Sequence, residues 1–250
     1  MKRILLIFIT LINIATSASA SYADTLTVAN VLCQDGKFKE AAAKYEAVLA
    51  SGNENVSVYY NLGYAYYKQG MLAKAILNFE RAKRLAPGDA DIQFNLEQAY
   101  EMTDKMQVIE PVFFVRWWES LCNSMSSDGW AITFIIVFVL MLVSIAAFLF
   151  ADSIGLRKTG FFSAIVLFFI AIASISISVR QKGLITDSHS AIIVKSSSTL
   201  NTTPDKNGTE MVVLHEGTPV YILSEVGDWY EVRLRDGNVG WIRKTDIEKI

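Results

Sequence analysis

The stretch VSVYYNLGYAYYKQGMLAKAILNFERAKRLAPGD, residues 56–89, decides the fold of the first soluble part of the chain. Its apolar and small residues recur at spacings of three and four, which predicts two helices. These residues are Tyr59, Leu62, Gly63, Tyr66, Gly70, Ala75, Phe79, Ala82 and Pro87. The small residues Gly63 and Ala75 allow two antiparallel helices to approach closely, Gly70 lies in the turn, and Pro87 ends the second helix. The stretch therefore predicts a helical hairpin.

The same pattern returns along the chain at a period of about 34 residues. Asn61-Leu62 recurs as Asn95-Leu96, and Tyr66 recurs as Tyr100. The preceding stretch keeps the register at Val28, Ala29, Leu32, Gly36, Ala41 and Tyr45. Period and pattern resemble the tetratricopeptide repeat, which implies an all-α repeat domain, here at residues 22–104. About two and a half repeats are visible where a stable array needs about three, so we expect residues 105–121 to supply a cap.

The resemblance also implies a concave face, formed by the first helix of each repeat, that holds a partner segment. On this face we expect Tyr60, Asn61, Tyr64, Tyr67, Lys68, Phe94, Asn95 and Gln98. The two asparagines match the family position that often bonds a ligand backbone, and aromatic residues are rigid contact anchors. The alternative is that the tyrosines pack against neighbouring repeats. Ser57, Asp91 and Glu101 stand where a basic clamp needs Lys or Arg, which disfavours capture of a free carboxyl terminus.

The composition indicates a membrane protein: 52% of the residues are hydrophobic, 19% are charged, and the mean hydropathy is +0.31. Two segments, Gly129–Ala151 and Thr159–Val179, contain no charged residue. Each is long enough to cross a bilayer core of about 30 Å as a helix. We therefore predict a transmembrane hairpin joined by a cytoplasmic loop at residues 152–158. Because neither segment has an ionisable side chain, the helices are interpreted as anchors and not as an ion pathway.

Residues 1–20 have the pattern of an export signal. Two basic residues precede an apolar run, and Ala18-Ser19-Ala20 fits a cleavage site. An uncleaved anchor is the alternative. With Arg157 and Lys158 on the cytoplasmic side of the hairpin, the positive-inside rule predicts a multi-pass membrane protein with both soluble parts on the non-cytoplasmic side, although Arg180 and Lys182 favour the opposite orientation. The family resemblance given below implies a bacterial inner membrane, where this side is the periplasm.

Residues 111–127 predict an amphipathic helix just before the membrane. Its large apolar residues fall mostly on one helical face: Phe113, Phe114, Trp117, Trp118 and Leu121. Tryptophan at this place is typical of a membrane interface, and a protein contact is the alternative.

Residues 190–250 change to the period-two alternation of β-strands, with turn signals such as Asp236-Gly237. About five short strands predict a small all-β barrel. The order Gly217-Thr218-Pro219-Val220, Gly227-Asp228-Trp229-Tyr230-Glu231-Val232 and Gly240-Trp241-Ile242 resembles a bacterial SH3 domain. The resemblance implies binding of cell-wall peptides or protein contacts, with Trp229, Tyr230 and Trp241 as candidates. The alternative is that Trp229 and Trp241 are half-buried barrel residues.

Several function classes are excluded or disfavoured. A net charge of −2 gives no basic field for nucleic acid, and two histidines with two cysteines disfavour a metal cluster. The sequence lacks phosphate-loop, dinucleotide-binding and nucleophile-elbow motifs. We therefore predict a protein without catalytic residues, metal or cofactor. Whether Cys33 and Cys122 form a disulfide remains open.

Taken together, the parts predict a multidomain membrane protein: tetratricopeptide helices, a two-helix transmembrane hairpin and an SH3-like barrel. This order resembles the BatE-type membrane proteins encoded with the Bat aerotolerance proteins. The resemblance implies membrane partners with von Willebrand A domains, a further Bat membrane protein and a MoxR-type ATPase on the cytoplasmic side. We predict a scaffold of an envelope complex. The alternative is an envelope sensor or anchor that binds peptidoglycan through the SH3-like domain.

Overall fold

The computed structural model describes residues 23–103, 112–187, 189–205 and 208–250, so the predicted export signal at residues 1–20 lies outside the described residues. The chain divides into two compact units. The first combines the repeat region, residues 23–103 without residues 84–88, with residues 189–250, which we call the β-domain. The second contains Arg84–Gly88 and residues 112–187.

The repeat region is helical, as predicted. Residues 23–34 form a helix, which is followed by α2 (Phe38–Ala50), α3 (Val56–Lys68), α4 (Leu72–Leu85) and α5 (Ala90–Tyr100). The period is visible in the helix caps. The Asn55 side chain accepts a hydrogen bond from the backbone N of Val58 at 3.0 Å, and Asp89, in the equivalent place of the next repeat, accepts one from Ile92 at 3.2 Å.

The two helices of the central repeat touch at a glycine. A Cβ atom added to Gly63 in α3 would lie 2.8 Å from Cδ1 of Phe79 and 3.1 Å from the carbonyl oxygen of Ala75, both in α4. Gly36 and Gly70 occupy equivalent inter-helix turns with φ of 75° and 73°, a conformation that side chains disfavour. The small residues that predicted a close helix pair are therefore required by the backbone geometry.

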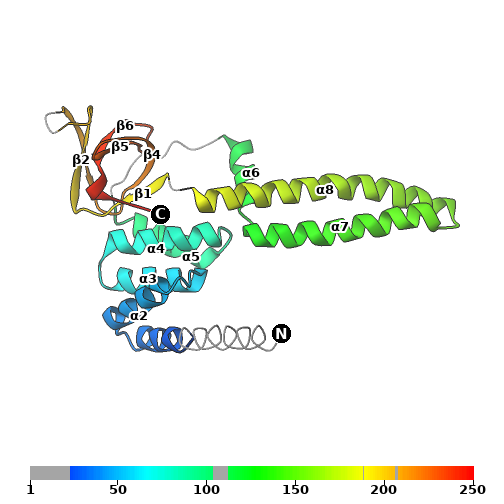
Figure 1. The fold of residues 1–250 in the computed structure, drawn as a ribbon, viewed down its shortest axis with the longest axis horizontal. Helices are drawn as coiled ribbons and strands as arrows, with labels where there is room; N and C mark the ends of the chain where they lie inside the picture. The colour runs from blue at the N-terminus through cyan, green and yellow to red at the C-terminus, as the bar shows by residue number, and fades with distance from the viewer. Residues whose placement is uncertain (1–22, 104–111, 188, 206–207) are drawn as a thin grey trace, which may run out of the picture. The chain divides into compact units, whose positions relative to one another are not determined.

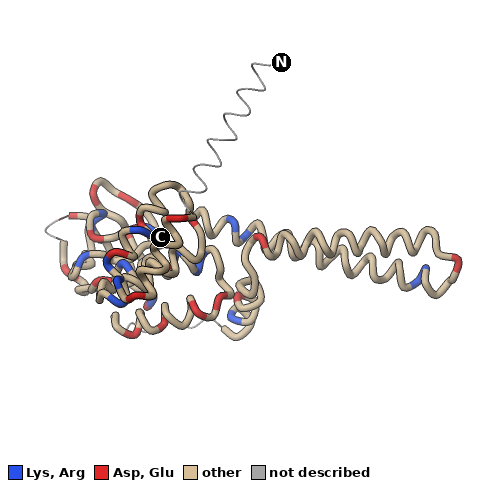
Figure 2. Tube along the Cα trace, turned by 90° about the horizontal axis from the view of Figure 1, so that it is seen from below, with Lys and Arg blue, Asp and Glu red and all other residues tan. Residues whose placement is uncertain are grey.

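The second unit contains α6 (Phe113–Cys122), α7 (Ser127–Phe150) and α8 (Ile154–Thr186), and α7 and α8 lie side by side as a hairpin (Figure 1). By length and composition α7 and α8 are able to cross a membrane. Charged residues are confined to the ends of this hairpin (Figure 2). Helix α8 begins at Ile154, within the segment 152–158 predicted as the cytoplasmic loop. Helix α6 covers Phe113–Cys122 of the segment 111–127 predicted as an amphipathic helix.

Polar contacts join the ends of the second unit. The Ser127 hydroxyl donates to the carbonyl of Ser178 at 3.1 Å, and the Ser178 hydroxyl donates back to the carbonyl of Ser127 at 2.9 Å. The Trp130 indole N–H donates to the carbonyl of Cys122 at 3.0 Å. At the other end, a Cβ on Gly160 would lie 2.7 Å from the carbonyl oxygen of Ser144, so α7 and α8 touch backbone to backbone there.

The β-domain is one antiparallel sheet with the strand order β3-β2-β6-β5-β4-β1-β7. Its strands are β1 (Ser190–Ile193), β2 (Ser197–Asn201), β3 (Glu210–His215), β4 (Pro219–Val226), β5 (Trp229–Arg233), β6 (Val239–Arg243) and β7 (Ile247–Lys249), with the 3-10 turn η1 (Lys244–Asp246). The described residues thus form seven strands and not about five. Leu200, Leu214, Val232 and Ile242 are at the centre of its apolar core. A Cβ on Gly240 would lie 2.7 Å from Cγ of Leu200, so only glycine lets β2 cross β6.

Replacement of Gly63 by valine is expected to destabilise the repeat region by about 1–3 kcal/mol, because the added side chain overlaps Phe79 and the α4 backbone. Amide hydrogen exchange of α3 and α4 in the intact protein measures this as faster exchange. Gly183→Val is the control, since nothing lies within 4 Å of a Cβ at that helical glycine. Equal exchange in α3 and α4 of the Gly63→Val variant and the wild type would contradict the packing.

Candidate functional site

The first candidate site is the set of residues predicted on the first helices, which we call the first-helix face. Helix α3 supplies Tyr60, Asn61, Tyr64, Tyr67 and Lys68, and α5 supplies Phe94, Asn95 and Gln98. These residues divide into two groups. The asparagines and tyrosines are half-buried, whereas Lys68, Phe94 and Gln98 are exposed.

Tyr60 and Asn95 join the two helices. The Asn95 side-chain nitrogen donates to the Tyr60 hydroxyl and to the carbonyl of Asp91, each at 2.9 Å. Burial raises the pKa of Tyr60, and the negative charge of Asp91 adds to this effect. The hydroxyl therefore stays neutral at physiological pH, and it retains its proton as a donor for a further hydrogen bond.

Asn61 faces the first repeat. Its side-chain nitrogen donates to Oδ1 of Asn30 at 3.3 Å, and the Tyr45 hydroxyl donates to the same oxygen at 2.7 Å. Asn61 is thus part of a contact between repeats. The sequence analysis did not single out Asn30. The feature that could have identified it is an amide side chain directly after the buried Ala29 in the first helix.

The three tyrosines also pack against the apolar core of the repeats, together with Phe38. The Tyr64 ring meets Phe38 edge-on at 6.1 Å between centroids, and the Lys68 ammonium lies 5.2 Å from the Tyr64 centroid. Most of the surface of these three tyrosines is therefore packed against the repeats, which is the alternative considered for them. Phe94 is different, because 62% of its surface is exposed in the middle of α5. An exposed aromatic ring of this size is a candidate contact residue.

The second candidate site is a polar pocket of about 290 Å³ on the β-domain. It is lined by Lys195, Thr199, Asn201, Gly208, Glu210, Trp229, Arg243 and Asp246. The Arg243 guanidinium lies 5.4 Å from the Trp229 ring centroid. Asn201 is only 9% exposed, and its side-chain oxygen has no hydrogen-bond partner among the described residues. Such an oxygen favours a ligand that donates a hydrogen bond.

Asp246 organises one wall of this pocket. It accepts hydrogen bonds from the Ser198 hydroxyl at 2.7 Å and from the Lys195 ammonium at 3.2 Å, both at Oδ2, and from the Thr245 hydroxyl at 3.0 Å at Oδ1. Burial by itself raises the pKa of Asp246, but these hydrogen bonds outweigh it and lower the pKa. The sequence did not single out Asp246 or Ser198.

Of the three aromatic residues predicted as β-domain contacts, Trp229 lines this pocket, and all three are half-buried. Tyr230 packs against the barrel core, with Lys244 and Lys249 at 5.0 and 5.1 Å from its ring centroid. Trp241 is paired with Asn201 where β2 meets β6. Partial burial fits the alternative that Trp229 and Trp241 are barrel residues, and it leaves part of each ring accessible.

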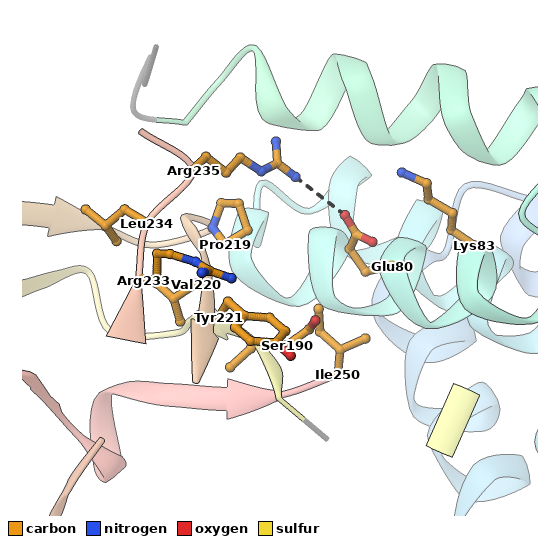
Figure 3. Close-up of a pocket in the computed structure, with 11 residues that line it drawn as sticks. Glu80, Lys83, Ser190, Pro219, Val220, Tyr221, Arg233, Leu234, Arg235 and Ile250 are labelled. Atoms are coloured by element: carbon orange, nitrogen blue, oxygen red, sulfur yellow. Dashed lines mark ion pairs between the residues drawn. The ribbon is translucent and has the colours of Figure 1, made fainter. Parts of the chain in front are cut away.

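A third site is a pocket of about 460 Å³ between the repeat region and the β-domain (Figure 3). Glu80 in α4 lies between Arg235 and Lys83, and the Arg235 guanidinium is 3.9 Å from a Glu80 oxygen. The Tyr100 hydroxyl donates to the same carboxylate at 2.6 Å. Burial beside Glu80 raises the pKa of Tyr100 well above its usual value. No sequence pattern predicted this pocket, because its residues come from segments far apart in the chain.

Both cysteines are free thiols: Cys33 is partly buried and Cys122 is buried. Burial raises the pKa of Cys33, so its thiol is less reactive at neutral pH. Within the described residues, no group of three or more His, Cys, Asp or Glu side chains is arranged to hold a metal ion.

Two family models match the chain. Residues 27–90 match the tetratricopeptide repeat, and residues 200–248 match the bacterial SH3 domain. Both are non-catalytic domains, and they support a role in protein interactions. A comparison with curated proteins finds no match. The helical repeats and the SH3-like β-domain expected from the sequence are thereby confirmed.

Ser198→Ala is expected to lower the free energy of unfolding of the β-domain at pH 7 by about 1.5–3 kcal/mol, the usual worth of a hydrogen bond to a charged group. Because the pKa of Asp246 is lowered by folding, this stabilisation is present above the unfolded value of about 3.9 and is lost as the pH falls below it. The difference between variant and wild type should therefore shrink below about pH 4.

Urea unfolding at pH 7 and pH 3, followed by tryptophan fluorescence, measures both effects. The control is Ser197→Ala, which changes the exposed neighbouring serine. A Ser198→Ala effect that is the same at both pH values would show that the carboxylate is not involved.

Proposed function

We propose that this protein is a membrane-anchored scaffold that binds a partner protein through the first-helix face. The observation that carries the proposal is the arrangement on α5. The exposed Phe94 and Gln98 lie one turn apart on α5, next to Asn95, whose amide donates to the Tyr60 hydroxyl. A rigid polar contact flanked by an exposed aromatic ring is a common composition of an interaction hot spot.

The packing of the soluble parts supports a common location for them. The β-domain and the repeat region belong to one compact unit, although α7 and α8 separate them in the sequence. A folded contact cannot form across a bilayer, and two crossings return the chain to the side from which it started. We therefore propose that α7 and α8 both span the membrane and that both soluble parts lie on the periplasmic side of a bacterial inner membrane.

The order of parts supports a finer proposal. Tetratricopeptide repeats, two apolar helices and a terminal bacterial SH3 domain follow each other as in BatE-type proteins. We propose that the protein serves an envelope complex connected with stress or oxygen tolerance. Its partners would be other membrane proteins, with von Willebrand A-domain Bat proteins as the first candidates.

The test is site-specific photo-crosslinking in native membranes, with the photoreactive residue at Gln98 in the full chain. We expect a crosslink to one membrane-anchored protein. Phe94→Ala should weaken it more than about tenfold, because loss of an aromatic hot spot costs about 2 kcal/mol or more. Met71→Ala is the control, since Met71 is also an exposed apolar residue of the repeat region, 39% exposed. An unchanged crosslink in Phe94→Ala would refute partner binding by this face.

The polar pocket of the β-domain favours a second candidate function, binding of peptidoglycan as an envelope sensor or anchor. The unpartnered oxygen of Asn201, the Trp229 ring and the charges of Lys195 and Glu210 suit a ligand with amide N–H groups and charged ends. Peptide stems of the cell wall have this chemistry. The two functions do not exclude each other.

Co-sedimentation of the detergent-solubilised full chain with purified sacculi tests this second function. Trp229→Ala should reduce the bound fraction about tenfold, since it removes the aromatic wall of the pocket. Val239→Ala, a change at an exposed strand residue outside the pocket, should bind like the wild type. Equal binding by wild type and Trp229→Ala, or no binding by either, would remove peptidoglycan from the function.

A further inference from the structure

Among the described residues, the repeat array ends with α5, the first helix of its third repeat. By the 34-residue period, the second helix of that repeat would cover residues 106–119, equivalent to α4. The described part of this range lies at and within α6, which belongs to the other unit. The sequence of α5 also disfavours a close second helix in the third repeat. Glu97 stands in α5 where the central repeat has Gly63, the glycine at which the two helices touch.

An array that stops at α5 leaves the flank of α4 without its next neighbour. Terminal repeats need a cap because this flank is otherwise an apolar surface in water. Here Leu72 and Ile76 of α4 lie on it, with Thr103 after α5. Nevertheless Ile76 is 0% exposed, so some part of the first unit covers it.

Strand β1 of the β-domain supplies apolar cover for the repeats. Side chains alternate between the two faces of a strand, and Ala191 and Ile193 belong to the core of the barrel. Ile192 therefore points to the outside of the barrel. It is 0% exposed and belongs to the buried apolar cluster of the repeats. The turn before β4 also contacts them, since a Cβ on Gly217 would lie 2.8 Å from Cδ1 of Ile76 and from Cγ2 of Thr103.

Ionic contacts accompany this packing. The Arg81 guanidinium of α4 pairs with Glu248 of β7 at 3.2 Å, and it donates to the carbonyl of Lys249 at 2.9 Å. Arg235, after β5, approaches Glu80 of α4. Apolar and ionic contacts thus come from four separate segments of the β-domain.

A comparison of two repeats indicates what the β-domain replaces. In the central repeat, the Tyr66 hydroxyl donates to Glu46 of the preceding helix, and the Lys74 ammonium of α4 lies 5.0 Å from the ring centroid. In the last repeat, Tyr100 donates to Glu80, which is the same pair shifted by one period. The cation over the Tyr100 ring is Arg235 of the β-domain, at 4.4 Å. Arg235 therefore fills the role that the second helix fills one repeat earlier.

We propose that the β-domain is the carboxyl-terminal cap of the repeat array and takes the place in which the second helix of a third repeat would pack. The domain is thus an integral part of the repeat fold, joined to it after the chain has passed through α7 and α8. The face of the barrel that carries Ile192 and Glu248 is occupied by this contact. The proposal goes beyond partner binding and does not depend on it.

Hydrogen exchange of the full chain in lipid nanodiscs tests the cap. In Ile192→Ser, amides of α4 and α5 should exchange about tenfold faster or more, because the apolar contact that holds the cap is lost. Strands β5 and β6 should keep their protection, since Ile192 is outside the barrel core. Val212→Ser, at an exposed valine of β3, is the matched control and should change neither region. Unchanged exchange of α4 and α5 in Ile192→Ser would overturn the proposal.

If Ile192→Ser also accelerates exchange in the barrel strands, a charge-reversal pair provides the test. Arg81→Glu and Glu248→Arg should each accelerate exchange of α4 several-fold, by breaking the ion pair and placing like charges together. The double variant restores the opposite charges and should return exchange close to the wild-type rate. A double variant no slower than the single variants would show that the two residues do not meet and would overturn the cap. Since exchange is measured without any partner, this result is separate from the crosslinking at Gln98.

Discussion

The burial of the open flank of α4 is the contact on which the first unit depends. A solenoid repeat buries its apolar surface only against its neighbours. In an array of two and a half repeats, the last repeat therefore leaves one apolar flank without a neighbouring helix. At about 25 cal/mol for each Å² of apolar surface, exposure of Leu72, Ile76 and the Tyr100 ring would be costly for so short an array. Gly217 of the β-domain lies at Leu72 and Ile76, and Arg235 lies over the Tyr100 ring. Ile192 belongs to the same buried apolar cluster. The two matched domains thus share one packed body in which each covers part of the other.

This contact constrains the path of the chain. The chain leaves the repeat region, runs through α7 and α8, and returns to build the strand that lies against the repeats. An even number of crossings is the condition for such a return. The hairpin fits this condition by its composition, because its charged residues lie only near its ends. Its two helices touch at Gly160. In the proposed topology the hairpin is the membrane anchor, and both proposed binding functions lie on the soluble parts.

Local sequence patterns predicted the helices and strands, but they could not predict contacts between residues that are far apart in the sequence. The period of 34 residues, the uncharged runs and the period-two alternation identified the helical repeats, the hairpin and the β-domain, because each pattern is set by its own element. The predicted cap at residues 105–121 illustrates the limit. Residues 105–111 lie outside the described residues, α6 belongs to the second unit, and Gly217 of the β-domain meets the open flank. One signal was present. Ala191-Ile192-Ile193 interrupts the alternation with three consecutive buried apolar residues, which is typical of a strand covered on both faces.

The same limit applies to the candidate site. Helical spacing placed the right residues on the first helices, but it could not separate those that pack from those that stay open, because both groups share one period. The structure separates them by contacts. Asn61 is bound to Asn30, Tyr64 packs on Phe38, and Phe94 is exposed. Burial of a residue depends on its partners in the neighbouring repeat, and these partners are not visible in the residue's own repeat.

The site and the cap are connected through one short helix. Asn95, which holds Tyr60 on the first-helix face, and Tyr100, which lies under Arg235 of the β-domain, are both on α5, about one and a half turns apart. Because both residues lie on α5, the proposed binding face and the proposed cap share one element. Any effect of the cap on the affinity of the face would, by linkage, be matched by an equal effect of the bound partner on the stability of the cap.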